Sequence, residues 1–164
     1  TLYTYRGSEG VFLKAQARHV LRSIKQLVAE GVPSEEIMVL SRFHRPLQDV
    51  QKSLLKEGST SFRNVRCLSV HQAKGSQATY VFLLSVVSGT FGFPSEIQDD
   101  TVLELVHPSQ GKTRAFEEER RLFYVALTRS KRFLLLYTRE GAQSLFLSEI
   151  HPFLKPLPLP WETD

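Results

Sequence analysis

The sequence contains only one cysteine, one methionine and one tryptophan among its 164 residues. Because a disulfide needs two cysteines, an internal disulfide is excluded, and Cys67 within "VRCLSV" is expected to be a buried thiol in a reducing compartment. No apolar run approaches the ~20 residues that a membrane-crossing helix needs, and the first residues lack the layout of a signal peptide. We therefore expect a soluble, cytoplasmic protein with no membrane partner. The chain starts at Thr1, and its only methionine is Met38, which suggests a piece of a longer protein.

Several common catalytic signatures are also missing. The "GKT" at 111–113 would close a phosphate-binding P-loop only with a glycine five positions before Gly111, where Val106 stands. No G-x-S-x-G sequence is present to anchor a hydrolase triad. The five histidines lack the i, i+4 spacing or the cysteine partners of a zinc site, so no metal site is evident.

The composition is that of one globular domain. Hydrophobic residues make up 41% of the chain and charged residues 23%, which is enough apolar material for a packed core. The formal net charge of +4 leans basic. Such a charge is compatible with a nucleic acid or a nucleotide phosphate as partner, but does not demand one.

Short apolar runs alternate with longer amphipathic stretches, a pattern typical of α/β proteins. The residues from Ser8 to Gly31 and from Pro46 to Gly58 predict helices. Strands that are apolar throughout favour a mostly parallel sheet covered by helices on both faces, an open α/β domain of about five strands. The expected strands are 2–6, 37–41, 65–70, 80–87 and 132–138.

We expect this domain to span 1–151 and a proline-rich extended tail to span 152–164. Residues 88–113 interrupt the pattern with Gly, Pro and Ser, and predict a surface excursion with one short helical piece near 100–106.

The stretch "LSVHQAKGSQATYVFLL" places polar residues directly after an expected strand. Ligands of open α/β sheets bind outside the carboxyl ends of the strands, so His71 and Lys74 lie where a ligand would bind. A solvated loop with no ligand explains the same position equally well.

The stretch "EEERRLFYVALTRSKR" (117–132) predicts a helix whose buried stripe ends in a cation. At helical spacing Arg129 follows Leu122, Val125 and Ala126 on one face. The acids at 117–119 suit a helix N-terminus and the cations at 129–132 its C-terminus, where Arg129 would bind the last carbonyls. An unpaired buried cation is costly, so we expect Arg129 to meet an acid or to face an anion outside the domain.

Together these stretches resemble the second RecA-like motor domain of superfamily 1 DNA helicases of the UvrD/Rep type, most closely the helicase IV branch. "LSVHQAKGSQATYVFLL" is similar to motif V, "EEERRLFYVALTRSKR" to motif VI, and "IMVLSRFHR" to a strand leading to a DNA-contacting loop. The resemblance runs roughly from Leu2 to Ile150. It implies a RecA-like fold without its own Walker A, ATP with Mg²⁺ held mainly by a first motor domain of the same polypeptide, and 3′ to 5′ translocation on single-stranded DNA.

The resemblance also implies roles for individual residues. Arg129 matches the arginine finger, the catalytic cation that reaches the γ-phosphate of ATP. The residues expected beside the nucleotide are Lys74, Gly75, Gln77, Thr128 and Arg129. The residues expected on the backbone of single-stranded DNA are Arg42, His44, Ser69 and His71.

The sequence departs from the UvrD/Rep pattern in two places. Gln77 stands where most members carry a glutamate, and an amide accepts a ribose hydroxyl less strongly than a carboxylate. Only "GSTSFRN" (58–64) stands where the UvrD/Rep type inserts a large helical subdomain. Two alternatives stay open: a non-catalytic docking module with a helicase-like fold, and a nuclease–helicase relative with a further domain.

Overall fold

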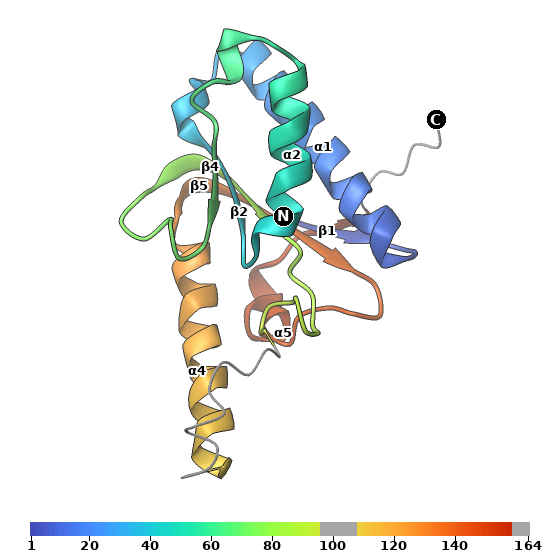
Figure 1. The fold of residues 1–164 in the computed structure, drawn as a ribbon, viewed down its shortest axis with the longest axis vertical. Helices are drawn as coiled ribbons and strands as arrows, with labels where there is room; N and C mark the ends of the chain where they lie inside the picture. Colours follow the sequence, from blue (N-terminus) through green and yellow to red (C-terminus); the bar gives the residue numbers. More distant parts are fainter. Residues whose placement is uncertain (96–107, 159–164) are drawn as a thin grey trace.

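One parallel sheet forms the centre of the molecule (Figure 1). The computed structural model describes the backbone of residues 1–95 and 108–158 and the side chains of 1–95 and 116–158. The strand order is β3-β2-β4-β5-β1-β6, and every pairing between these strands is parallel. The strands are β1 (Leu2–Tyr5), β2 (Ile37–Ser41), β3 (Arg66–Ser69), β4 (Ala78–Leu84), β5 (Ser130–Arg139) and β6 (Pro156–Pro158). The predicted parallel α/β sheet is confirmed.

The sixth strand lies in the proline-rich tail. The sequence predicts an extended segment there, and the structure pairs it with β1 at the edge of the sheet. Proline has no N–H to donate, so an edge strand with only one neighbour is where it is tolerated. The predicted five strands therefore become six.

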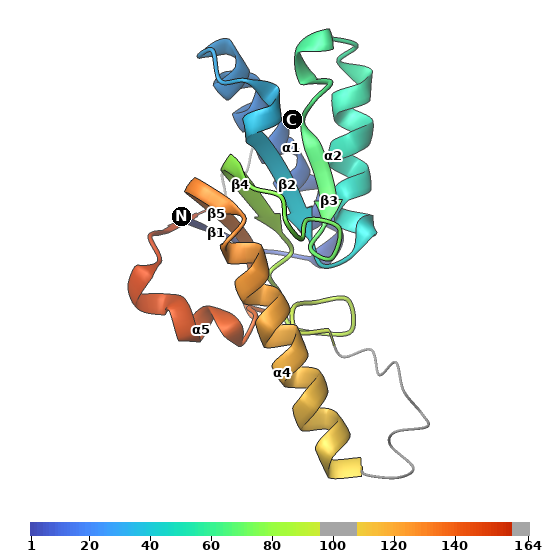
Figure 2. The ribbon, with the colours of Figure 1, turned by 90° about the vertical axis from the view of Figure 1, so that its left-hand side faces the viewer.

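Helices cover both faces of the sheet, as the sequence predicts (Figure 2). One face carries α1 (Glu9–Ala29) and α2 (His44–Lys56), and the other carries α4 (Pro108–Leu127) and α5 (Phe146–Ile150). The amino-terminal part of α4 projects well beyond the sheet in both views. Helix α1 ends just before Gly31, whose φ of +87° is readily adopted only by glycine.

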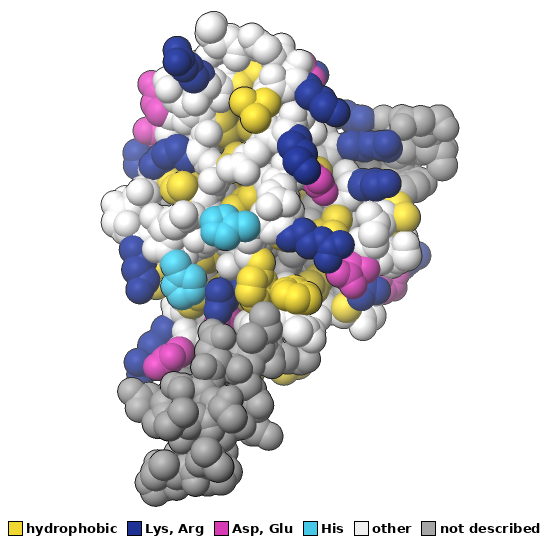
Figure 3. Space-filling view, in the orientation of Figure 1, with side chains coloured by type: hydrophobic (Ala, Val, Ile, Leu, Met, Phe, Trp, Pro, Cys, Tyr) yellow, Lys and Arg dark blue, Asp and Glu magenta, His cyan; other side chains and the backbone are white. Residues whose placement is uncertain are grey.

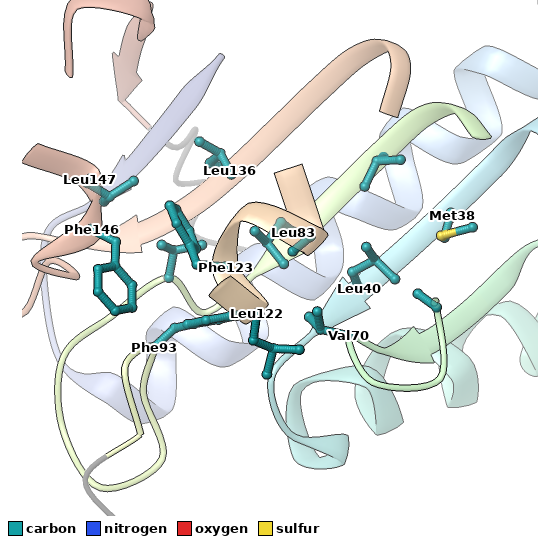
Figure 4. Packing of buried hydrophobic residues seen from close by; sticks show 14 of the residues in the cluster. Met38, Leu40, Val70, Leu83, Phe93, Leu122, Phe123, Leu136, Phe146 and Leu147 are labelled. Atoms are coloured by element: carbon teal, nitrogen blue, oxygen red, sulfur yellow. The ribbon is translucent and has the colours of Figure 1, made fainter. Parts of the chain in front are cut away.

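Alternate residues of each strand build the two halves of the core. In β2, Met38 and Leu40 pack with α4, whereas Ile37 and Val39 pack with α1 and α2, and all four are fully buried. Each such side chain contributes roughly 1.5–3 kcal/mol through removal from water. On the α4 side, the aromatic rings of Phe93, Phe123 and Phe146 pack together at the end of the cluster (Figure 4).

The helix predicted over 117–132 was placed wrongly at both ends. Helix α4 begins at Pro108 and ends at Leu127, so the acids at 117–119 lie in its interior, and Lys131 and Arg132 lie in β5. The prediction that these acids and cations lie at opposite ends of one helix, where they would interact with its dipole, is therefore wrong for all of these residues. The "GKT" at 111–113 lies inside α4 rather than in a loop that leaves a strand. The helical piece expected near 100–106 lies outside the described residues.

Candidate functional site at the two ends of the sheet

The predicted site residues divide between the two ends of the sheet. Arg42, His44, Ser69 and His71 lie at the carboxyl ends of β2 and β3, where β2 stops at Ser41 and β3 at Ser69. Gln77, Thr128 and Arg129 lie at the opposite end, just before the first residues of β4 and β5. Strands of five to seven residues separate the two groups by on the order of 20 Å.

The loop between β3 and β4 connects the two groups. Because β3 and β4 both run parallel to β2, the chain must return from the carboxyl end of β3 to the amino end of β4. The loop has His71 at the carboxyl end of the sheet and Gln77 at the amino end of β4, and the exposed residues Lys74 and Gly75 lie between them in sequence. Gly75 has a φ of +80°, in the region that favours glycine. His71 therefore lies at the carboxyl edge of the sheet, as expected, whereas the same loop carries Gln77 to the opposite end.

Arg129 is the second residue after α4 and is half-buried. Its Nε donates to the carbonyl of Val125 at 2.9 Å, its Nη1 to the carbonyl of Ser76 at 3.3 Å, and its Nη2 to the hydroxyl of Thr128 at 3.0 Å. The expectation that this cation binds the last helical carbonyls is confirmed for one of them, that of Val125. Within the described part of the chain it meets no acid, so all of its partners there are neutral oxygens.

Gln77 and Thr128 lie beside Arg129. The amide of Gln77 donates to the carbonyl of Thr128 at 3.3 Å, and the backbone N–H of Ala78 donates to the carbonyl of Arg129 at 3.0 Å. The hydroxyl of Thr128 donates in turn to the carbonyl of Val125 at 2.9 Å. These bonds fix the end of α4 against the end of the loop that carries Gln77.

A network that the sequence reasoning missed braces this end of the sheet. Glu36, just before β2, accepts hydrogen bonds from the backbone N–H of Thr79 at 2.9 Å and from its hydroxyl, and it forms an ion pair with Lys131 at 3.0 Å. These bonds lower the pKa of Glu36 to about 2. The three residues come from separate segments, so no local sequence pattern brings them together.

Arg66, the first residue of β3, binds the end of the β3–β4 loop that carries Gln77. Its Nη2 donates to the carbonyls of Glu35 at 2.9 Å and Gln77 at 2.8 Å, while its Nε is buried without a partner among the described residues. Backbone carbonyls from two neighbouring segments are thus joined by one side chain. No motif in the sequence points to this role for Arg66.

At the other end, Arg42 is bound by a carboxylate that the sequence reasoning also missed. Glu119 of α4 accepts from Nε of Arg42 at 3.0 and 3.1 Å and from its Nη2 at 2.8 Å. It also accepts from the backbone N–H of Ser95 at 3.0 Å. The Arg42 guanidinium lies 4.9 Å from the ring centre of Phe43. These bonds occupy Nε and Nη2, so Nη1 is the part of the guanidinium without a partner among the described residues.

The two predicted histidines are exposed at this end. His44 is the first residue of α2 rather than part of a loop, which corrects the prediction, and His71 follows β3 by two residues. Burial and the nearby cations of Arg42 and Lys74 lower the pKa of His71, while Glu119 opposes them. The loops after β2 and β3 lie side by side, because the two strands are paired and both end at this edge.

Ser69 is buried and its hydroxyl is engaged. It donates to the side-chain oxygen of Gln72 at 3.0 Å, and the same oxygen accepts from the backbone N–H of Ser69 at 3.0 Å. Gln72 therefore closes the first turn of the loop. Of the four residues expected on DNA, Ser69 is the one whose side chain is least accessible.

Other site types find no support in the described residues. They contain no group of three His, Cys, Asp or Glu residues that could hold a metal ion. No described helix is both long and apolar enough to cross a membrane. Burial raises the pKa of the Cys67 thiol to about 12, which makes it a poor nucleophile at neutral pH.

Comparisons with known proteins place the chain among DNA helicase relatives. The UvrD-like helicase C-terminal domain model matches residues 47–141, which include α4 and the loop between β3 and β4 but neither Arg42 nor His44. DNA helicase IV of Escherichia coli is 33% identical over 122 residues, covering 72% of this chain and 17% of that protein. A probable DNA helicase of Mycoplasma pneumoniae is 32% identical over 125 residues, covering 76% of this chain and 21% of that protein.

The ATP-dependent DNA helicase Rep of Salmonella typhimurium is 28% identical over 138 residues, covering 80% of this chain and 18% of that protein. The chain thus spans about a fifth of the length of these relatives. The family model covers more than half of the chain, and the parallel sheet with helices on both faces is consistent with its RecA-like fold. The chain belongs to the family of UvrD-like helicase C-terminal domains, of the UvrD/Rep type.

Proposed function

We propose that this chain is the second motor domain of an ATP-dependent DNA helicase that moves 3′ to 5′ along single-stranded DNA in the cytoplasm. A first motor domain of the same polypeptide would hold most of the ATP and Mg²⁺. This chain would supply Arg129 to the nucleotide at one end of its sheet and a track for DNA phosphates at the other. Relatives named DNA helicases, with this chain matching about a fifth of their length, support the proposal.

The observation that carries the proposal is the set of partners around Arg129. Its guanidinium is half-buried and bound by neutral oxygens, with no carboxylate partner among the described residues. A phosphate adds a full negative charge to a hydrogen bond from the guanidinium, so it binds this cation more strongly than a neutral carbonyl does. A triphosphate can therefore draw Arg129 away from these carbonyls. The charge and position of this side chain fit a nucleotide held by a neighbouring domain.

The neighbouring residues would orient the nucleotide end. Gln77 and Thr128 hydrogen-bond at the base of Arg129, so they fix the backbone from which the guanidinium extends. Lys74 and Gly75 precede this point in the same loop and are exposed. When bound, ATP supplies the free energy for movement along DNA. We expect this chain alone to be inactive, because the "GKT" at 111–113 lies in a helix and forms no phosphate cradle.

At the opposite end, Arg42, His44 and His71 can donate hydrogen bonds to phosphates, and such contacts do not distinguish one base from another. Ser69 would contribute mainly by shaping the loop, since its hydroxyl is held by Gln72. Helix α4 is in contact with both ends: Glu119 binds Arg42, and Arg129 follows the last turn. When the two motor domains close on ATP, a movement of α4 would therefore also move Arg42 in the DNA track.

The test uses a polypeptide that joins this chain to its first motor domain. We expect Arg129→Ala to lower DNA-stimulated ATP turnover by ~10³- to 10⁵-fold, as arginine fingers do, while DNA affinity stays near normal. The matched control is Arg132→Ala, which removes an exposed arginine three residues later, and turnover there should be normal. Near-normal turnover in Arg129→Ala would remove Arg129 from the mechanism.

A further inference from the structure

An exposed phenylalanine, Phe91, lies beside the proposed DNA track. Its side chain is 63% exposed, and its ring meets the ring of Phe43 edge to face, with the ring centres 5.6 Å apart. Phe43 directly follows Arg42, whose guanidinium lies 4.9 Å from the Phe43 ring centre. Two aromatic rings and a cation thus stand next to one another at the carboxyl end of β2. The space-filling view shows hydrophobic, basic and histidine side chains grouped on the face that carries α2 (Figure 3).

The segment that carries Phe91 is held firmly on both sides. Before it, the backbone N–H of Ser88 donates to the carbonyl of Ala142 at 2.9 Å. After it, Phe93 is fully buried between Phe123 and Phe146. Phe91 is therefore an exposed ring on an anchored segment, so little conformational entropy is lost when a ligand packs against it.

The turn around Phe91 is also tightly closed. The backbone N–H of Gly92 donates to the carbonyl of Gly89 at 2.8 Å, and a Cβ added at Gly92 would lie 2.1 Å from the carbonyl oxygen of Val87. Gly89 has a φ of +122°, which favours glycine. Both glycines are thus required for the conformation that turns Phe91 outward.

We propose that Phe91, supported by Phe43, is a stacking platform for a base of the single-stranded DNA whose phosphates meet Arg42, His44 and His71. Proteins that bind single strands without sequence preference combine a cationic groove with aromatic side chains on which bases stack. The charge of the neighbouring side chains favours a nucleic acid over an apolar protein segment as the occupant. The inference rests on the proposed function, and it adds a base contact to a track otherwise made of phosphate contacts.

The test measures binding of the full chain to a fluorescein-labelled oligothymidylate by anisotropy at low salt. We expect Phe91→Ala to weaken binding by ~5- to 150-fold, the loss expected when one base no longer stacks on a ring. The dependence of affinity on salt should be unchanged, because no phosphate contact is removed. Phe91→Trp should retain affinity, and Phe91→Leu should not, since leucine keeps apolar contact without a ring.

The matched control is Phe153→Ala in the 3-10 helix His151–Phe153, where a phenylalanine is 88% exposed outside the loops after β2 and β3. It should bind as the wild type does. Wild-type affinity in Phe91→Ala, or full affinity in Phe91→Leu, would overturn the stacking role and leave the phosphate track standing. Absence of binding by the wild-type chain would overturn the track itself, and the stacking proposal with it.

Discussion

The carboxylate of Glu119 accepts hydrogen bonds from two nitrogens of the Arg42 guanidinium, Nε and Nη2, although the two residues are 77 positions apart in sequence. Both side chains are largely buried, with 18% of Arg42 and 13% of Glu119 exposed. The bond joins the loop after β2 to the middle of α4. It therefore links an expected DNA contact to the helix that precedes Arg129.

The first prediction concerns the strength of this ion pair. Each of Arg42→Ala and Glu119→Ala leaves a mostly buried charge without its partner, and we expect each to lower the free energy of unfolding by ~2–4 kcal/mol. The double variant should lose ~1–3 kcal/mol less than the sum of the two, because the residues are in contact. Urea denaturation of the four proteins measures this coupling.

The control for this cycle is Arg6 with Glu140, an ion pair whose side chains are 85% and 53% exposed. Exposed pairs contribute little, so its coupling should stay under ~1 kcal/mol. Equal coupling energies for the two pairs would contradict the claim that burial strengthens the pair of Arg42 and Glu119. So would strictly additive losses of unfolding free energy for Arg42→Ala and Glu119→Ala.

The second prediction concerns protons and DNA. The pKa of His71 is lowered from 6.5 by burial and by the cations of Arg42 and Lys74, against the opposing effect of Glu119. A bound phosphate favours the charged imidazole and raises this pKa, so DNA binding takes up a proton. Affinity for single-stranded DNA should therefore increase as the pH falls from about 7 through the ordinary histidine range.

Anisotropy titrations over this pH range in wild type and His71→Asn measure the effect. The variant should show a flatter dependence on pH. His151→Asn is the control, since His151 is exposed in the 3-10 helix after α5, and it should keep the wild-type dependence. An identical slope in wild type and His71→Asn would exclude His71 as the linked group.

The third prediction concerns stability in acid. The folded pKa of Glu36 is held at about 2 by Thr79 and Lys131, well below the ~4.3 of an unfolded glutamate. A lowered carboxyl pKa stabilises the fold above the unfolded value, and this contribution is lost as the pH falls from ~4.3 to about 2. Glu36→Gln should thus be less stable at neutral pH and lose less stability on acidification.

Urea midpoints at neutral and acidic pH measure this difference. Glu35→Gln is the matched control, because it removes the adjacent, exposed carboxylate and should behave as wild type. If Glu36→Gln and wild type lost stability in parallel on acidification, the network would not be the cause of the lowered pKa.

The fold was largely predictable because local periodicity and burial act together along this chain. The continuous apolar run at 37–41 became a strand with all five residues buried, and Gly31 stopped α1 as predicted. The start of α4 was not predictable from the acids at 117–119, because a helix that projects from the sheet can place charges in its middle. The edge strand at Pro156–Pro158 was missed because its pairing depends on β1, more than 150 positions away.

The site was predictable where a motif lies on one segment. Arg129 binds the carbonyl of Val125 in the last turn of α4, as its position after Ala126 suggests, and His71 lies at a strand end. The partners Glu119 and Glu36 were missed, because each meets its site from a distant part of the sequence.

One measurement tests most directly whether the two ends of the sheet have separate roles. It is the DNA-stimulated ATP turnover of Arg129→Ala and of His44→Ala in the two-domain polypeptide, over a range of DNA concentrations. Arg129→Ala should lower the maximal rate by ~10³- to 10⁵-fold at an unchanged half-saturating DNA concentration. His44→Ala should keep the maximal rate and raise that concentration by ~2- to 12-fold, the loss of one hydrogen bond. Two variants that change the same parameter would contradict the division of the site between the two ends.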